Sequence, residues 1–186
     1  MAQDTILIVD DEPNVIASLK RVFTDEPYEI YSAAGALEGI EILKNNPVKV
    51  VVSDEKMPDV TGSEFLAMVR EQFPDIIRIM LTGHASIEAA MKAINKGEIY
   101  RFFTKPWDDT ELRFAVIAAV DKYNLEEENR RLLRIVKRQA LNIKLLERQF
   151  PGITKLDRDE NDRILLPDVS EEEITQIMSQ FEREFI

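Results

Sequence analysis

Short apolar runs alternate along residues 1–120 with longer segments in which apolar positions recur every three or four residues. The apolar runs, which favour β-strands, cover residues 5–10, 28–33, 48–54, 76–82 and 100–105. The segments between them predict helices that begin at Pro13, span 35–46 and 63–73, and begin again near Ser86 and Asp109. This alternation indicates an α/β fold with a five-stranded doubly wound parallel sheet over residues 1–120. The runs at 5–10, 48–54 and 76–82 are apolar enough for burial on both faces, which places them centrally.

A seven-residue repeat follows, in a segment from 109 to 150 that contains no Pro or Gly. Its a positions are Lys122, Asn129, Val136, Ile143 and Phe150, and its d positions are Leu125, Leu132, Gln139 and Leu146. β-Branched residues at a with Leu at d favour a parallel two-stranded coiled coil, in which one buried Asn sets the register. We therefore predict a coiled-coil homodimer over residues 121–150, continuous with the preceding helix. Further apolar residues widen the stripe and leave a four-helix arrangement open, namely Leu133, Ile135, Leu141 and Leu145.

The sequence Pro151-Gly152 ends that helix and begins an acidic tail over residues 151–186. Two short strands around a polar turn are expected first, and a terminal amphipathic helix after them. Acidic residues in the turn have the spacing of a calcium-binding loop, but Asp162 stands where such a loop needs Gly, so we interpret them as a solvated turn. The apolar face of the terminal helix is expected to dock on its own chain or on a partner.

Composition and charge narrow the classes of function. The chain has 186 residues and no Cys, it has no apolar run long enough to span a membrane, and its start does not resemble a signal peptide. We therefore expect a cytoplasmic protein with no membrane partner. The net charge of −11 divides into −8 for residues 1–120, +3 for 121–150 and −6 for 151–186, which argues against nucleic acid as a partner. The basic residues of 121–150 are interpreted as a solvated helix face.

Residues that can take part in chemistry stand where predicted strands end. They are Asp10 and Asp11 after the first strand, Asp54 after the third, Thr82 after the fourth and Lys105 after the fifth. The carboxyl ends of parallel strands meet at one edge of the sheet, where open α/β sheets bind ligands. Three carboxylates there form an oxygen-rich site suited to Mg²⁺, which we expect as the cofactor.

A carboxylate in such a site is also a nucleophile for phosphorus. Attack by Asp54 would give an acyl phosphate, provided that Mg²⁺ and a cation neutralise the charge on the transferred group. Lys105 can supply that cation, and the Thr82 hydroxyl can donate to a phosphoryl oxygen. Each residue alone also fits an ordinary loop or strand end, but their joint occurrence at one edge favours phosphoryl transfer, with Asp54, Thr82 and Lys105 as the catalytic residues.

Four motifs, ILIVDDE, VVSDEKMPDVTG, IMLTGHA and FFTKPW, resemble those of the two-component response regulator receiver family in order and approximate spacing. The resemblance covers about residues 4–120 and implies a flavodoxin-like fold with Asp54 as the phosphorylated residue. It implies Asp11 as a direct metal ligand, Asp10 as a mainly water-mediated one, and the Lys56 carbonyl as a third contact. In the family, the bond corresponding to Lys105–Pro106 is cis.

The resemblance also implies a switch. Thr82 matches the family's switch hydroxyl and Phe102 its switch aromatic residue, although a Phe can equally belong to the core. Phe102 has no hydroxyl, so its outward state should favour an apolar partner surface. Lys56 and His84, each two residues after a site residue, match positions that tune hydrolysis of the acyl phosphate.

The output is not evident from the chain. Similar receivers stand in front of cyclic-dinucleotide phosphodiesterases, but the single His, His84, cannot build their metal centre. We also find no ATP-binding loop and no basic helix-turn-helix segment. We therefore expect a response regulator that receives its phosphoryl group from a histidine kinase and acts on an unidentified protein target through the coil and tail. Packing of the coil on a kinase helix bundle, and a role as a phosphorelay intermediate or phosphate sink, are the alternatives.

Overall fold

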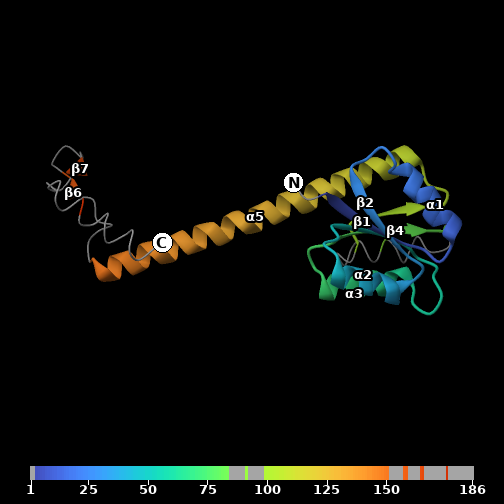
Figure 1. Ribbon diagram of the computed structural model, residues 1–186, viewed down its shortest axis with the longest axis horizontal. Helices are drawn as coiled ribbons and strands as arrows, with labels where there is room; N and C mark the ends of the chain where they lie inside the picture. Colours follow the sequence, from blue (N-terminus) through green and yellow to red (C-terminus); the bar gives the residue numbers. More distant parts are fainter. Residues whose placement is uncertain are drawn as a thin grey trace. The chain divides into compact units, whose positions relative to one another are not determined.

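The computed structural model describes residues 3–83, 91, 99–150, 157–158, 164–165 and 175, and its centre is a five-stranded sheet (Figure 1). The strands are β1 (Asp4–Val9), β2 (Tyr28–Ala33), β3 (Val50–Asp54), β4 (Ile77–Thr82) and β5 (Arg101–Thr104). Their order is β2-β1-β3-β4-β5 and every pairing is parallel. The predicted strands are therefore confirmed to within two residues, and the three most apolar runs are the central strands.

Two apolar layers cover the faces of the sheet because successive strand residues point to opposite sides. Leu7 and Val9 pack with Leu43 and Phe65, on the side of α2 (Ala36–Asn45) and α3 (Gly62–Gln72). Ile6 and Ile8 pack on the other face, against α1 (Pro13–Val22) and the first part of α5 (Asp109–Gln149). Figure 1 shows α2 and α3 together on one side of the sheet. The doubly wound fold is confirmed.

Helix α5 is 41 residues long, and its first part belongs to the compact unit formed by residues 1–131. Past residue 121 it is held at the amino-terminal edge of the sheet by two polar contacts. The Lys49 ammonium lies 2.6 Å from the Asn124 side-chain oxygen and 2.7 Å from an Asp4 carboxylate oxygen. Farther along, Arg130 lies 3.0 Å from Asp75. These contacts are made at the sheet edge opposite Asp54.

Residues 132–186 form a second compact unit. It contains the rest of α5 and an antiparallel pair of two-residue strands, β6 (Asp157–Arg158) and β7 (Ile164–Leu165), which agrees with the pair predicted in the tail. Among the described residues, no helix is both long and apolar enough to cross a membrane. The helix predicted from Ser86, the His84 side chain and most of the predicted terminal helix lie outside the described residues. The boundaries at 120 and 150 and the coiled coil stay predictions.

Candidate functional site

The carboxyl edge of the sheet brings together three of the predicted residues, Asp10, Asp54 and Lys105. β1 and β3 are neighbouring strands, so the two carboxylates that follow or end them lie side by side. The Lys105 ammonium, delivered by the segment after β5, lies 2.6 Å from Asp54 Oδ1 and 3.0 Å from Asp10 Oδ2. The bond between Lys105 and Pro106 is cis, as the resemblance implied. A buried pair of acids thus shares one cation.

Burial and charge act against one another at this cluster. Burial raises the pKa of Asp10 above its ordinary value, although the Glu12 amide, which donates to Asp10 Oδ1 at 2.8 Å, and Lys105 act in the opposite direction. For Lys105, burial lowers the pKa, but the bonds and charges of Asp54 and Asp10 outweigh it, so the pKa is held above its ordinary value. Lys105 therefore stays charged, as the neutralisation of a phosphoryl group requires.

The loop between β3 and α3 lies against Asp54. The Lys56 amide donates to Asp54 Oδ2 at 2.8 Å, while the Lys56 side chain is exposed. At the far end of the loop, the backbone of Gly62 approaches so closely that a Cβ there would lie 2.0 Å from the Asp54 carbonyl oxygen. The carboxylate is therefore held in one orientation by an amide on one oxygen and by Lys105 on the other.

The remaining predicted site residues lie around this cluster. Thr82 is buried at the end of β4, and its hydroxyl donates to the Gly83 carbonyl at 3.2 Å. Phe102 on β5 is half-buried and packs against the core on the α2 and α3 side. Asp11 is exposed. The roles of all three as switch or metal residues stay predictions.

The donors at this edge fit a magnesium ion in their chemistry. Mg²⁺ prefers a few carboxylate oxygens together with water, and each carboxylate oxygen has a second lone pair beyond the one its protein partner uses. Asp10, Asp54 and the backbone of Lys56 would hold the ion. Within the part of the chain that the structure describes, however, no three acidic, His or Cys side chains converge. Since Lys105 contacts both Asp10 and Asp54, a metal bound by these two carboxylates would share them with Lys105.

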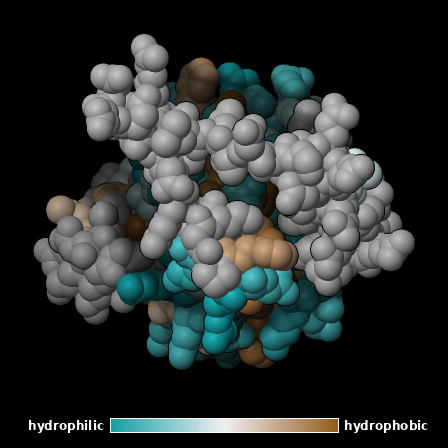
Figure 2. Space-filling view, turned by 90° about the vertical axis from the view of Figure 1, so that its left-hand side faces the viewer, coloured by the Kyte–Doolittle hydropathy of each residue, from teal (hydrophilic) through white to brown (hydrophobic). Residues whose placement is uncertain are grey.

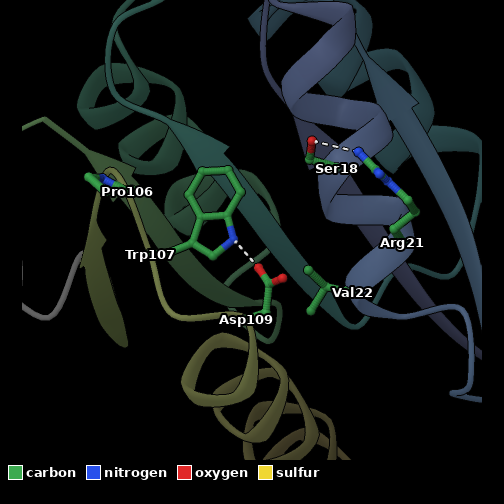
Figure 3. A pocket seen from close by; sticks show the side chains of 6 residues that line it. All are labelled: Ser18, Arg21, Val22, Pro106, Trp107 and Asp109. Carbon is green, nitrogen blue, oxygen red and sulfur yellow. Dashed lines mark hydrogen bonds between the residues drawn. The ribbon is translucent and has the colours of Figure 1, made fainter.

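A surface cavity of about 440 Å³ lies beside the segment that carries Lys105 (Figure 3). It is lined by Ser18, Arg21 and Val22 of α1 and by Pro106, Trp107 and Asp109. Figure 3 shows the hydrogen bond between the Trp107 indole and Asp109, the first residue of α5. Trp107 Nε1 donates to Asp109 Oδ1 at 3.0 Å. Trp107 is the single Trp of the chain, two residues after Lys105, so its fluorescence can report movement of that segment.

The family model of the response regulator receiver domain matches residues 6–117, which include β2 to β5, all of β1 except its first two residues, and both Asp10 and Asp54. This chain belongs to the response regulator receiver family. The resemblance seen in the four motifs is thereby confirmed over the matched residues, and the chain carries a receiver domain of the kind found in two-component systems.

Similar proteins agree with this assignment. The chain is 36% identical over 130 residues to the hydrogenase transcriptional regulatory protein HoxA of Cupriavidus necator, covering 70% of this chain and 27% of the relative. It is 32% identical over 142 residues to the transcriptional regulatory protein GlrR of Escherichia coli, covering 76% and 32%. The solved signal receiver domain of an HD domain-containing protein from Pseudomonas fluorescens matches with a TM-score of 0.65 at 34% identity, over 69% of this chain and 94% of that one. The chain spans between a quarter and a third of the length of these curated relatives.

Two contributors to the receiver site were missed in the sequence. The Glu12 amide that orients Asp10 is a backbone group, and no residue type marks it. Glu55, beside Asp54, is buried and accepts hydrogen bonds from Ser63, although an acid in a polar loop is ordinarily solvated. For Glu55, the only signal in the sequence was its place next to Asp54.

Replacing Lys105 by alanine should separate two roles of this cation. Phosphorylation by a small phosphodonor should slow by about a hundredfold or more, because one charge that stabilises the transition state is lost. Mg²⁺ affinity should rise, because no cation competes for Asp10 and Asp54. Stopped-flow Trp107 fluorescence and calorimetric Mg²⁺ titration measure the two effects. Lys56→Ala, which removes the same charge from an exposed side chain nearby, should leave Mg²⁺ affinity unchanged. Weaker Mg²⁺ binding by Lys105→Ala would contradict the competition.

Proposed function

We propose that this receiver is a phosphorylation switch in which Asp54 accepts a phosphoryl group from a histidine kinase. The observation that carries the proposal is the position of Asp54, held by the Lys56 amide on one oxygen and by Lys105 on the other at the ligand-binding edge of the sheet. Receiver domains interact with histidine kinases, and membership of the family supports this partner.

The residues divide the work of the transfer. Mg²⁺, when bound, supplies charge neutralisation on the phosphoryl oxygens. An Asp54 oxygen forms the new bond to phosphorus as the bond to the donor breaks, and Lys105 moves its charge from the carboxylate pair to the incoming oxygens. The buried Thr82 hydroxyl donates to the Gly83 carbonyl, and Thr82 is paired with Thr104, the residue before Lys105. We propose this hydroxyl as a donor to the phosphoryl group.

Phosphodonor labelling tests this proposal. The full chain, incubated with a small phosphodonor and Mg²⁺, should gain one phosphoryl group, located by peptide mass on the segment that contains Asp54. A chelator should prevent the gain. Labelling located at another residue, or equal labelling with and without Mg²⁺, would overturn the assignment.

For the output, we propose that the switch acts through α5, by self-association and binding of a protein target. The contacts of Lys49 and Arg130 hold the first turns past residue 121, using Asn124 and Asp75 as partners. On the same helix, Leu125 stays 65% exposed, although it occupies a predicted core position of the coil. The receiver therefore holds one face of α5 and leaves the predicted coil face uncovered.

The same exposure continues along α5 in the second unit. Leu132, Val136 and Ile143 are each about half exposed or more in the single chain. Among the coloured residues of Figure 2, a few apolar ones in brown lie between polar ones in teal. Fully burying an exposed Leu, Val or Ile side chain contributes about 1.5–3 kcal/mol, and these half-exposed residues can gain about half of that on association. This apolar face favours the predicted homodimer.

Charge substitutions on α5 should separate the proposed arrangements of the coil. Leu132→Lys with Val136→Lys should raise the dissociation constant of the dimer at least about tenfold, because core positions lose their apolar contacts and gain repulsion. Leu141, 58% exposed but on the outer side of a two-stranded coil, is the matched control. Sedimentation equilibrium gives both constants. An unchanged mass for the double variant contradicts the coil, whereas dissociation by Leu141→Lys contradicts two strands and favours four helices.

A further inference from the structure

Glu55 follows the nucleophile directly and is fixed at three points. Its amide donates to the Leu81 carbonyl at 2.8 Å, which extends the pairing of β3 with β4. Its carbonyl accepts from the Gly62 amide at 3.0 Å. Its carboxylate accepts from both the amide and the hydroxyl of Ser63, each at 2.8 Å. The residue is 8% exposed, so its carboxylate makes its contacts inside the protein and not with solvent.

These contacts join the two ends of the loop over residues 55–62. The backbone bond to Gly62 and the side-chain bonds to Ser63 tie the start of the loop to the first turn of α3. Inside the closed loop lies Lys56, whose amide holds Asp54 Oδ2. A carboxylate that accepts from helix amides forms a charge-assisted bond, which is about twice as strong as a neutral one. The loop near the nucleophile is therefore closed by a strong contact that the cap of α3 does not require.

The contact between Glu55 and Ser63 is separate from the amino-terminal cap of α3. Helix α3 already has a complete capping box, in which Thr61 accepts from the Glu64 amide and the Glu64 carboxylate accepts from the Thr61 amide. Glu55 reaches the same helix start from the opposite end of the loop. Two Glu residues thus serve one helix, and only Glu55 is adjacent to Asp54.

We propose that Glu55 is a positioning residue for phosphorylation: by binding Ser63 across the loop, it holds the Lys56 backbone against Asp54 and so prepares the metal-binding side of the site. This inference rests on the proposed phosphorylation of Asp54 and on the Lys56 backbone as a metal contact. Glu55 does not touch the reacting atoms. Its effect passes through Lys56 and appears in Mg²⁺ affinity rather than in the rate at saturating Mg²⁺.

The experiment compares Mg²⁺ binding and amide exchange in the full chain. Glu55→Ala should raise the Mg²⁺ dissociation constant about tenfold in calorimetry and speed hydrogen exchange of the Lys56 amide in metal-free protein. Phosphorylation at saturating Mg²⁺ should stay within about threefold of the wild-type rate. Glu55→Gln keeps an oxygen acceptor for Ser63 but not the charge, so it should restore part of the affinity. Ser63→Ala, which removes only the hydroxyl, should give a smaller shift in the same direction.

Glu64→Ala is the matched control, because it removes the other Glu of the same helix start. Both alanine variants should lower the thermal midpoint, but Glu64→Ala should leave Mg²⁺ affinity and Lys56 exchange unchanged. Equal weakening of Mg²⁺ binding by both variants would reduce Glu55 to a second helix cap and overturn the inference. Wild-type Mg²⁺ affinity in both Glu55→Ala and Ser63→Ala would overturn it as well, while labelling of Asp54 in the wild type would still stand. Failure of the wild type to be labelled would instead reject the proposed function.

Discussion

Asp54→Asn should abolish phosphoryl labelling of the full chain, by at least about a thousandfold under conditions that label the wild type completely. The amide has the shape of the carboxylate and keeps an oxygen for the Lys56 amide, which lies 2.8 Å from Asp54 Oδ2. It is no nucleophile for phosphorus, however, and it removes one of the two charges that hold Lys105. The loss of labelling is therefore chemical, and it does not require a change of fold. Intact-protein mass after phosphodonor treatment measures it.

Asp59→Asn provides the matched control for this result. Asp59 is an exposed acid in the same loop, and its positive φ of 66° is one that Asn adopts readily. The chemical change and the loss of charge are the same, so labelling should match the wild type. Equal labelling of Asp54→Asn and wild type would reject Asp54 as the acceptor. Loss of labelling in both variants would show that loop charge, not the nucleophile, limits the reaction.

Gly62→Ala should lower the free energy of unfolding by about 3 kcal/mol or more. A Cβ at this position would lie 2.0 Å from the Asp54 carbonyl oxygen and 2.8 Å from Glu55 Cα. Both atoms belong to the backbone of the segment leaving β3, so no side-chain rotation relieves the overlap. The loop has to open, which moves Lys56 away from Asp54. Urea denaturation measures the stability, and phosphodonor labelling of the folded fraction should be slowed as well.

Gly35→Ala is the control for this glycine. Its added Cβ would meet no atom within 4 Å, and its φ of 177° is extended backbone that any residue adopts. The stability should stay within about 0.5 kcal/mol of wild type. If Gly62→Ala were equally harmless, the close approach of α3 to Asp54 would not be needed for folding.

The contacts of Lys49 with Asn124 and of Arg130 with Asp75 attach α5 to the amino-terminal edge of the sheet. Lys49 precedes β3 and Asp75 precedes β4, so the same strands that bear the site at one edge hold Asn124 and Arg130 at the other. Two cations also lie over one aromatic ring there, since Lys49 and Arg130 are each about 6 Å from the centre of the Tyr123 ring. The proposed output thus begins at β3 and β4, the strands that also carry the proposed phosphorylation site.

The order of strands and helices in the receiver could be predicted because it depends on patterns within short stretches of sequence. Alternation of apolar runs with helical periodicity determines the order of strands and helices, and Asp10, Asp54 and Lys105 follow strands whose ends must meet in a parallel sheet. The site residues were therefore found from their position relative to the strands. The coil was predicted from a periodic pattern too, but a single chain has no partner helix to test it.

By itself, the sequence determined the fold class, and it identified the two acids and the lysine that gather at the carboxyl edge of the sheet. Only the tertiary structure decided which atoms face one another. Lys105 binds both Asp10 and Asp54, so that any metal shares these carboxylates with a cation. The Glu55 carboxylate accepts from the Ser63 amide. Lys49 donates to Asn124, which lies 75 residues farther along the chain. Such contacts depend on the distance and direction between side chains that strand pairing and helix packing set together, and no local pattern of residue types specifies them.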